Sequence, residues 1–262
     1  RLGQAELALA LVILAWGLRR MPVAAAAACL VLFWWDYAIS YCWRAGGAEP
    51  TQLLGIAASA VLVARAGAGG AAWAASGFFL AWALAAKPTA LILLPAYAAW
   101  IWREGGREAW RRAAWFAAGT APIALAAGYF LLSHPEMAQR AWQATVRQAG
   151  DHDRGAWTAL GVGAFHWWNL GWRHTLAPLF HLGILAAAPL LFSGKTGERE
   201  REEIRWYGWL ALSGYLCLFL FPPTARRYVM IALPLAVVAG RALLRPGAWD
   251  ELVSWCAPRP GR

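Results

Sequence analysis

LAWALAAKPTALILLPAYAAW, residues 80–100, is an apolar stretch that contains a single charged side chain, Lys87, followed by Pro88. Lys87 is also the only charged residue between Arg65 and Arg103. Proline lacks an N–H and disfavours the α conformation of its predecessor, so the pattern predicts two apolar helices that separate at Lys87 and Pro88. An ammonium group at such a break either reaches a membrane surface or belongs to a functional site, and the spacing leaves both alternatives open.

The composition of the whole chain indicates an integral membrane protein. The 262 residues are 60% hydrophobic and 15% charged, and they include 19 tryptophans. Soluble domains average about 45–50% apolar and about 25% charged residues, and tryptophan is enriched where membrane helices meet water. The four cysteines contain no Cys-x-x-Cys pair and are predicted to be packing residues: Cys29, Cys42, Cys217 and Cys256.

Nine apolar runs predict the fold class. They cover residues 6–18, 23–40, 51–64, 70–86, 89–102, 113–133, 175–193, 207–221 and 229–244. Several of these runs approach the length of about 20 residues with which a helix spans a bilayer. We therefore expect an all-α fold, a polytopic transmembrane bundle of about nine helices that forms a single domain over residues 1–262. Because the chain opens at Arg1 rather than at Met and the first run begins almost at once, we also expect an N-terminal part to be missing.

The basic residues predict how the chain is oriented in a membrane. The loops at residues 19–20, 65, 103–112 and 195–205 and the tail from residue 241 hold fifteen of the 24 lysines and arginines. These loops alternate with the others along the chain, and short basic loops stay in the cytoplasm. The same bias accounts for the net charge of +10 without a nucleic-acid partner.

The opposite, outer face collects the candidate functional residues. Lys87 is either a headgroup anchor or a cation for a lipid phosphate, assisted by Thr89 and by the N-terminus of the following helix. Glu49 either complements the dipole of the helix that it opens or contacts a metal ion or a substrate. Asp36 either pairs with Arg44 or water, or is a catalytic residue.

Two further segments of the outer face carry candidate binding residues. Arg226, Arg227 and Tyr228 follow a Pro-Pro pair, and two guanidinium groups on the outside oppose the positive-inside bias. This departure indicates an anionic ligand, and headgroup anchoring is the alternative. Residues 133–174 predict an outer interfacial segment that opens with a capped amphipathic helix. Its His166 and His174 either bind a phosphate or sugar or stand among interfacial tryptophans. No metal site is assigned.

Four stretches of the chain resemble membrane glycosyltransferases of the GT-C superfamily, in particular the bacterial branch near the protein mannosyltransferases and the aminoarabinose transferases. RLGQAELALALVILAWGLRRMPVAAAAACLVLFWW (1–35) resembles a helix hairpin of that family with a short cytoplasmic Arg-Arg turn. GGAEPTQLLGIAASAVLVAR (46–65) resembles the point where an acidic residue opens the next helix. GFFLAWALAAKPTALILLPA (77–96) and RRYVMIALPLAVVAG (226–240) resemble its helix–Lys–helix element and its closing Arg-Tyr helix. The sequence contains no Walker A, HExxH or GxSxG motif.

The resemblance implies transfer of a sugar from a polyprenyl-phosphate donor to an acceptor hydroxyl on the outer, periplasmic face of the bacterial inner membrane. It places Lys87 and Arg227 near the donor phosphate and gives Glu49 the second acidic position, while the main acidic base is expected upstream of Arg1. The acceptor is a lipid, a glycan or a protein, and membrane lipids are further partners. No cofactor is assigned beyond the alternative of a divalent cation. A transporter or flippase and a non-catalytic membrane subunit are the alternative functions.

Overall fold

The computed structural model describes residues 2–19, 23, 26–27, 29–31, 48–65, 69–103, 105–137, 139–140, 143 and 198–220 of the chain. Helices form the regular structure of these residues, and no strand occurs among them. The helices are α1 (Leu2–Leu18), α4 (Glu49–Arg65), α5 (Gly70–Ala86), the 3-10 helix η1 (Pro88–Leu93), α6 (Leu94–Trp102), α7 (Gly106–Ser133) and α11 (Glu198–Leu220). The predicted all-α class is therefore confirmed for the described part of the chain.

Six of the nine predicted apolar runs coincide with these helices or overlap them. The run 70–86 matches α5 residue for residue. Helix α7 begins at Gly106 rather than at residue 113, because Glu108 pairs with Arg111 and Arg112 one turn further on and so adds a charged first turn to the apolar helix. The runs 175–193 and 229–244, and most of 23–40, lie outside the described residues.

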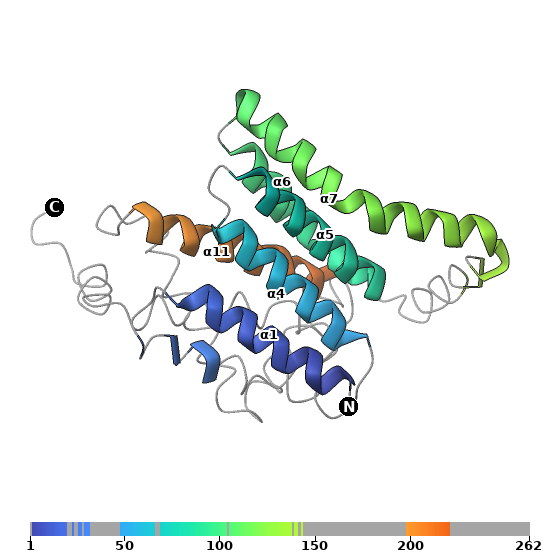
Figure 1. The fold of residues 1–262 in the computed structure, drawn as a ribbon, viewed down its shortest axis with the longest axis horizontal. Coiled ribbons are helices and arrows are strands. Elements are labelled where there is room, and N and C mark those ends of the chain that lie inside the picture. Colours follow the sequence, from blue (N-terminus) through green and yellow to red (C-terminus); the bar gives the residue numbers. More distant parts are fainter. Residues whose placement is uncertain are drawn as a thin grey trace, which may run out of the picture.

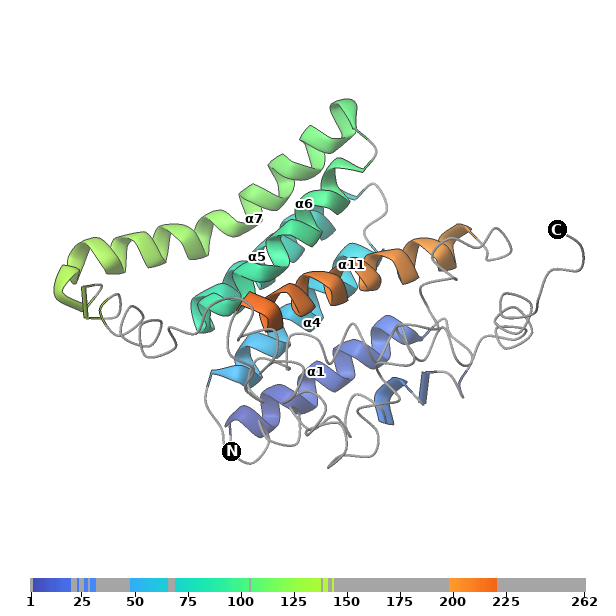
Figure 2. The ribbon, with the colours of Figure 1, turned by 180° about the vertical axis from the view of Figure 1, so that it is seen from behind.

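The helices α1, α4, α5 and α7 form a layer, and η1, α6 and α11 pack behind it. Figure 1 shows α1, α4, α5 and α7 side by side, and Figure 2 shows α11 crossing the back of α4. Helices α1 and α4 run in the same direction, since Thr51 near the start of α4 bonds to Glu6 near the start of α1. Helix α5 returns antiparallel to α4, since Gln52 bonds to the backbone of Lys87 just beyond the end of α5. The end of α5 therefore lies beside the start of α4.

The core is centred on Trp206 of α11, whose side chain is fully buried. Its indole N–H donates a hydrogen bond to the carbonyl oxygen of Ala60 in α4 at 2.9 Å. The ring centroids of Tyr97 and Trp100 in α6 lie 4.9 and 5.4 Å from the Trp206 ring. Cys29 is also fully buried, which agrees with its predicted packing role. One aromatic side chain thus holds α11 against two helices that are distant in the sequence.

A buried cluster of hydroxyl groups joins α4, α5 and α6. The Ser59 hydroxyl lies 2.8 Å from the Ser76 hydroxyl and 2.6 Å from the Tyr97 hydroxyl. All three side chains are buried. Each hydroxyl can both donate and accept, so the three groups satisfy one another inside the apolar bundle.

We expect Ser59→Ala to lower the free energy of unfolding by about 1–3 kcal/mol, because the substitution removes a buried hydrogen-bond partner from both Ser76 and Tyr97. Unfolding of the detergent-solubilised protein, followed by tryptophan fluorescence, measures the change. The control is Thr120→Ala, since the exposed Thr120 hydroxyl only donates to the carbonyl oxygen of Ala117. Equal effects of the two substitutions would contradict a stabilising role for the cluster.

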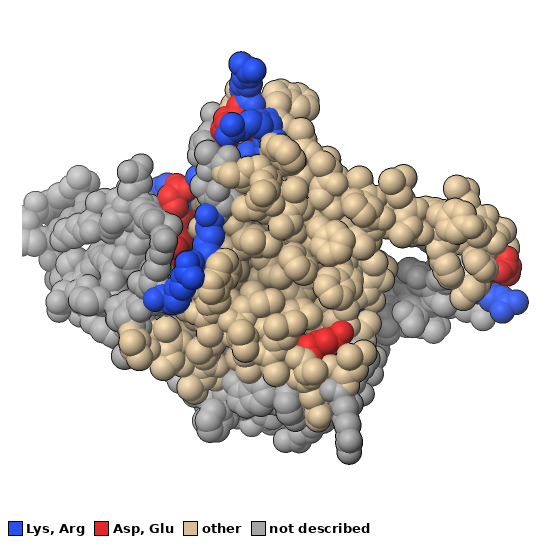
Figure 3. Space-filling view, in the orientation of Figure 1, with Lys and Arg blue, Asp and Glu red and all other residues tan. Residues whose placement is uncertain are grey.

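Charged side chains gather at the two ends of α1, α4 and α5. One end holds Glu6, Glu49 and Lys87, and the other holds Arg19, Arg65, Arg103, Arg107, Arg111, Arg112 and Glu202. Figure 3 shows a broad surface without charged residues between the two groups on this face. Helix α4 has 17 residues and is therefore about 25 Å long, close to the ~30 Å thickness of a bilayer's hydrocarbon core.

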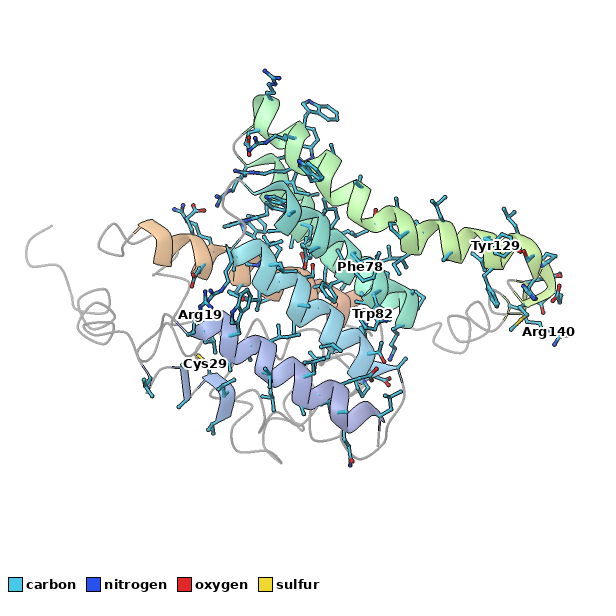
Figure 4. The ribbon with its side chains drawn as sticks, viewed as in Figure 1. Arg19, Cys29, Phe78, Trp82, Tyr129 and Arg140 are labelled. Carbon is cyan, nitrogen blue, oxygen red and sulfur yellow. The ribbon has the colours of Figure 1, made fainter. Side chains whose placement is uncertain are left out.

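The second half of α7 leaves the bundle. Pro122 lies inside this helix, where it removes a backbone hydrogen bond, and Figure 1 shows that α7 changes direction and projects outward. The projecting half exposes large apolar side chains: Leu125, Tyr129 and Leu132 are 73%, 76% and 84% exposed, and Tyr129 is labelled in Figure 4. Among the described helices, α7 is the one that is both long and apolar enough to cross a membrane, whereas α1, α5 and residues 88–102 are apolar but shorter.

The predicted helix N-cap at Ser133 is wrong. Ser133 is the last residue of α7, and His134 caps the C-terminus by donating its backbone N–H to the carbonyl oxygen of Phe130 at 3.0 Å. The apolar run before Ser133 continues the helix through the serine, so that Ser133 cannot take the extended conformation of an N-cap residue. The helix predicted to follow is nevertheless present where the chain is described, since residues 135–137, 139–140 and 143 are helical. Most of the predicted interfacial segment 133–174 lies outside the described residues.

Candidate functional site

An ion pair between Lys87 and Glu49 forms the centre of the candidate site. The Nζ atom of Lys87 lies 2.6 Å from Oε1 of Glu49. The two residues are 38 positions apart in the sequence. The Lys87 side chain is 23% exposed, whereas the Glu49 side chain is only 4% exposed. The ammonium group is therefore the accessible partner of the pair, and the buried carboxylate binds it from the interior of the bundle.

Local sequence explains why Lys87 stands at this position. It follows the last residue of α5 and precedes Pro88, and its backbone is extended, with φ −156° and ψ 116°. Its N–H still bonds to the carbonyl oxygen of Ala83 at 3.0 Å, and its carbonyl oxygen accepts from the N–H of Ala90 at 3.2 Å. Lys87 is thus the C-cap of α5 and the N-cap of η1. Its side chain extends from the break between the two helices.

Glu49 is placed by the start of α4, of which it is the first residue. The following Pro50 suits the first turn of a helix, because its missing N–H would have no partner there. A carboxylate in this turn also interacts favourably with the helix dipole. The dipole role that the sequence suggested and the contact with Lys87 are therefore compatible, and both hold the carboxylate at this end of the bundle.

Gln52, one turn after Glu49, ties α4 to the break at Lys87. Its Nε2 donates to the carbonyl oxygen of Lys87 at 3.3 Å and to Oγ1 of Thr89 at 3.0 Å. Gln52 is fully buried, and its Oε1 has no hydrogen-bond partner. A buried amide oxygen without a partner carries a cost of about 1–3 kcal/mol, so this atom is a candidate acceptor for a ligand group.

A second polar contact brings α1 to the same end of the bundle. The hydroxyl of Thr51 lies 2.9 Å from each carboxylate oxygen of Glu6. Thr51 follows Glu49 by two positions, so the carboxylates of Glu6 and Glu49 belong to the same end of the layer. The described part of the chain nevertheless contains no cluster of three or more His, Cys, Asp or Glu side chains that could hold a metal ion.

The arrangement leaves Lys87 able to bind an anion. An ammonium group has three N–H donors, and the bond to Glu49 uses one of them. The remaining donors can reach the oxygens of a phosphate at the exposed side of the group. Glu49 also fixes the direction of a flexible four-carbon side chain, which lowers the entropy that binding would otherwise cost.

The structure brings Glu49 and Lys87 together, which sequence reasoning did not anticipate as a pair. The other predicted site residues lie outside the described residues: Asp36, His166, His174, Arg226, Arg227 and Tyr228. Thr89 was expected to assist a phosphate; its hydroxyl accepts a hydrogen bond from Gln52 and keeps its own O–H donor. The helix after Lys87 begins as the six-residue 3-10 helix η1.

Sequence reasoning missed Gln52 and Glu6. A signal for Gln52 was available: it lies three residues after Glu49, so the two side chains share one face of a helix, and it is the one amide side chain of α4. Glu6 had no comparable signal. Its bond to Thr51 depends on how α1 packs against α4 over a separation of 45 positions.

Arginines from the described parts of four predicted basic loops lie at the end of the bundle opposite Lys87. Arg65 donates to the carbonyl oxygens of Trp16 and Gly17 at 2.8 and 2.6 Å, and its guanidinium lies 4.6 Å from the Trp16 ring centroid. Arg19, labelled in Figure 4, lies at the same end and stacks on the same ring at 5.1 Å. Arg103 forms an ion pair with Glu202 of α11.

In comparisons with protein-family models, with curated proteins and with solved structures, no match to this chain is found.

Proposed function

We propose that this chain is a membrane-embedded glycosyltransferase of the GT-C type. It transfers a sugar from a polyprenyl phosphate to an acceptor hydroxyl on the outer face of the bacterial inner membrane. The observation that carries the proposal is the ion pair of Lys87 and Glu49 at a break between two apolar helices. In this function Lys87 and Arg227 hold the donor phosphate, and Glu49 orients Lys87 and supports the acceptor. Arg226, Tyr228, His166 and His174 are proposed substrate contacts, and Asp36 is a proposed catalytic residue.

The charge balance of sugar transfer supports this use of Lys87. The bond between the anomeric carbon and the phosphate oxygen breaks, and the phosphate leaves with the electron pair. The acceptor oxygen bonds to the same carbon and gives its proton to a carboxylate base, which the resemblance assigns to a loop upstream of Arg1. Negative charge grows on the leaving phosphate, and a fixed cation there contributes about 3 kcal/mol in a site of low dielectric.

The distribution of charge supports a place in the membrane. A polyprenyl chain stays in lipid while its phosphate lies in the headgroup region, so the reacting group must meet the protein at a membrane surface. Glu49 and Lys87 lie at one end of α4, and Arg65 lies at the other end, about one hydrocarbon core away. The exposed apolar side chains on the second half of α7 also suit contact with lipid.

A sugar-transfer assay tests the proposal. Inner membranes that contain the full-length protein are incubated with radiolabelled glucosyl, mannosyl or pentosyl polyprenyl phosphates, and label is measured in lipid, glycan and protein fractions. We expect transfer from at least one donor and a loss of roughly 100-fold for Arg227→Ala, which removes a phosphate ligand. The control Arg107→Ala removes an exposed cation of α7 and should leave transfer unchanged. Full activity of Arg227→Ala would refute the phosphate role.

The same membranes discriminate the alternative functions. Uptake of the labelled donor into proteoliposomes without transfer would support a transporter or flippase. Neither uptake nor transfer, with tolerance of substitutions at Lys87 and Arg227, would support a non-catalytic subunit. The buried hydroxyls of Ser59, Ser76 and Tyr97 bond to one another and therefore need no transported ligand as a partner.

A further inference from the structure

Gln52 buries a side-chain oxygen that has no hydrogen-bond partner. The side chain is fully buried, and its two amide N–H donors are directed at the backbone oxygen of Lys87 and at Oγ1 of Thr89, 3.3 and 3.0 Å away. Its Oε1 is the acceptor that remains without a partner. A protein that buries such an atom either loses about 1–3 kcal/mol or uses the atom to receive a donor from a bound molecule.

The orientation of this amide is determined by its neighbours. The carbonyl oxygen of Lys87 can only accept a hydrogen bond, so the atom of Gln52 that faces it must be the NH2 group. Turning the amide over would place two acceptors against each other and lose this bond. Oε1 therefore points away from the Lys87 carbonyl, although it shares one carbon atom with the nitrogen that binds there. The acceptor stands within the same turn of α4 as Glu49.

We propose that Gln52 is a ligand-binding residue of this site, whose Oε1 accepts a hydrogen bond from a hydroxyl group of the bound sugar. The inference rests on the proposed function and names one contact of its donor: Lys87 receives the phosphate, and Gln52 receives a hydroxyl of the sugar attached to it. A neutral amide oxygen suits a neutral hydroxyl, whereas the phosphate requires the ammonium group. The NH2 group of the same amide bonds to the backbone of Lys87. This bond fixes the distance between the phosphate contact at Lys87 and the sugar contact at Gln52.

Two ligands that differ only in the sugar test this contact without turnover. They are a short-chain prenyl phosphate and its glucosyl or mannosyl phosphodiester, and the probe is the intrinsic tryptophan fluorescence of the full-length protein in detergent. We expect the wild-type protein to bind the preferred sugar ester about fivefold more tightly than the prenyl phosphate, as one neutral hydrogen bond allows. In Gln52→Met, whose side chain has a similar shape but no amide, the two ligands should bind with about the same affinity.

Control variants separate the contact from a loss of structure. Thr89→Val removes one partner of the Gln52 NH2 group and leaves Oε1 in place, so it should keep the preference for the sugar ester. Lys87→Met should weaken both ligands together. If Gln52→Met keeps the preference, or if Thr89→Val abolishes it equally, the inference is overturned while the phosphate site stands. If the wild-type protein binds neither ligand, the proposed function fails and the inference fails with it.

Discussion

Lys87→Met is expected to lower the free energy of unfolding by about 3 kcal/mol, because it removes the ammonium partner of a carboxylate that is only 4% exposed. Glu49→Gln should cost about 1 kcal/mol, since the Lys87 side chain is 23% exposed and its ammonium group can turn toward water or headgroups. Unfolding of the detergent-solubilised variants by a graded increase of a denaturing detergent measures both changes. Arg107→Met, which removes an exposed cation, is the matched control.

The double variant Lys87→Met with Glu49→Gln separates stability from function. Its stability should recover to within about 1 kcal/mol of the wild-type protein, because a neutral amide no longer needs the ammonium group. Sugar transfer should stay lost, since the cation for the leaving phosphate is still absent. A double variant that is as unstable as Lys87→Met would contradict the energetic role of the ion pair. A double variant that regains transfer would contradict the phosphate role of Lys87.

Gly119→Ala is expected to destabilise the protein by about 3 kcal/mol, because α5 and α7 touch backbone to backbone at this residue. A Cβ atom on Gly119 would meet the carbonyl oxygen of Ala74 closer than real Cβ atoms ever approach, and one on Gly77 would meet the carbonyl oxygen of Phe116 in the same way. The two helices would have to separate, which loses packing along their whole contact. Thermal unfolding followed by size-exclusion chromatography measures the loss.

Gly128→Ala is the matched control for this substitution. It lies in the same helix, and a Cβ atom there would meet nothing within 4 Å. Since alanine favours the helix more than glycine does, Gly128→Ala should leave stability unchanged or raise it by about 0.5–1 kcal/mol. Similar losses at both glycines would show that helix propensity, rather than the close approach of α5 and α7, sets the effect.

The predictions that held concern local chemistry. The bounds of α5 and the break at Lys87 and Pro88 follow from a run of apolar residues and from a proline that lacks an N–H. The N-cap expected at Ser133 lies too early, because the apolar run continues α7 through Ser133; the helical residues that follow begin at Pro135. The start of α7 was placed too late for a related reason: its first turn is charged and satisfied by pairs within the helix.

The partners of the site residues could not be predicted in this way. Helix α5 is apolar around its whole circumference except at Ser76, so its sequence pattern does not define which face meets α4 and which meets α7. The rotation and spacing of the helices follow from close contacts such as that of Gly55 with the carbonyl oxygen of Phe79, where a Cβ atom would lie at 2.7 Å. Such contacts depend on pairs of positions that are distant along the chain.

The sequence by itself determined an all-α chain of apolar helices, the break that presents Lys87, and the grouping of arginines into alternate loops, since each depends on neighbouring residues. The tertiary structure alone decided that Lys87 meets Glu49, that Gln52 binds the backbone of the break, and that Thr51 meets Glu6. The physical reason is that a helix rotates by about 100° per residue. The packing of glycines and aromatic rings between helices therefore selects which polar side chains share one end of the bundle.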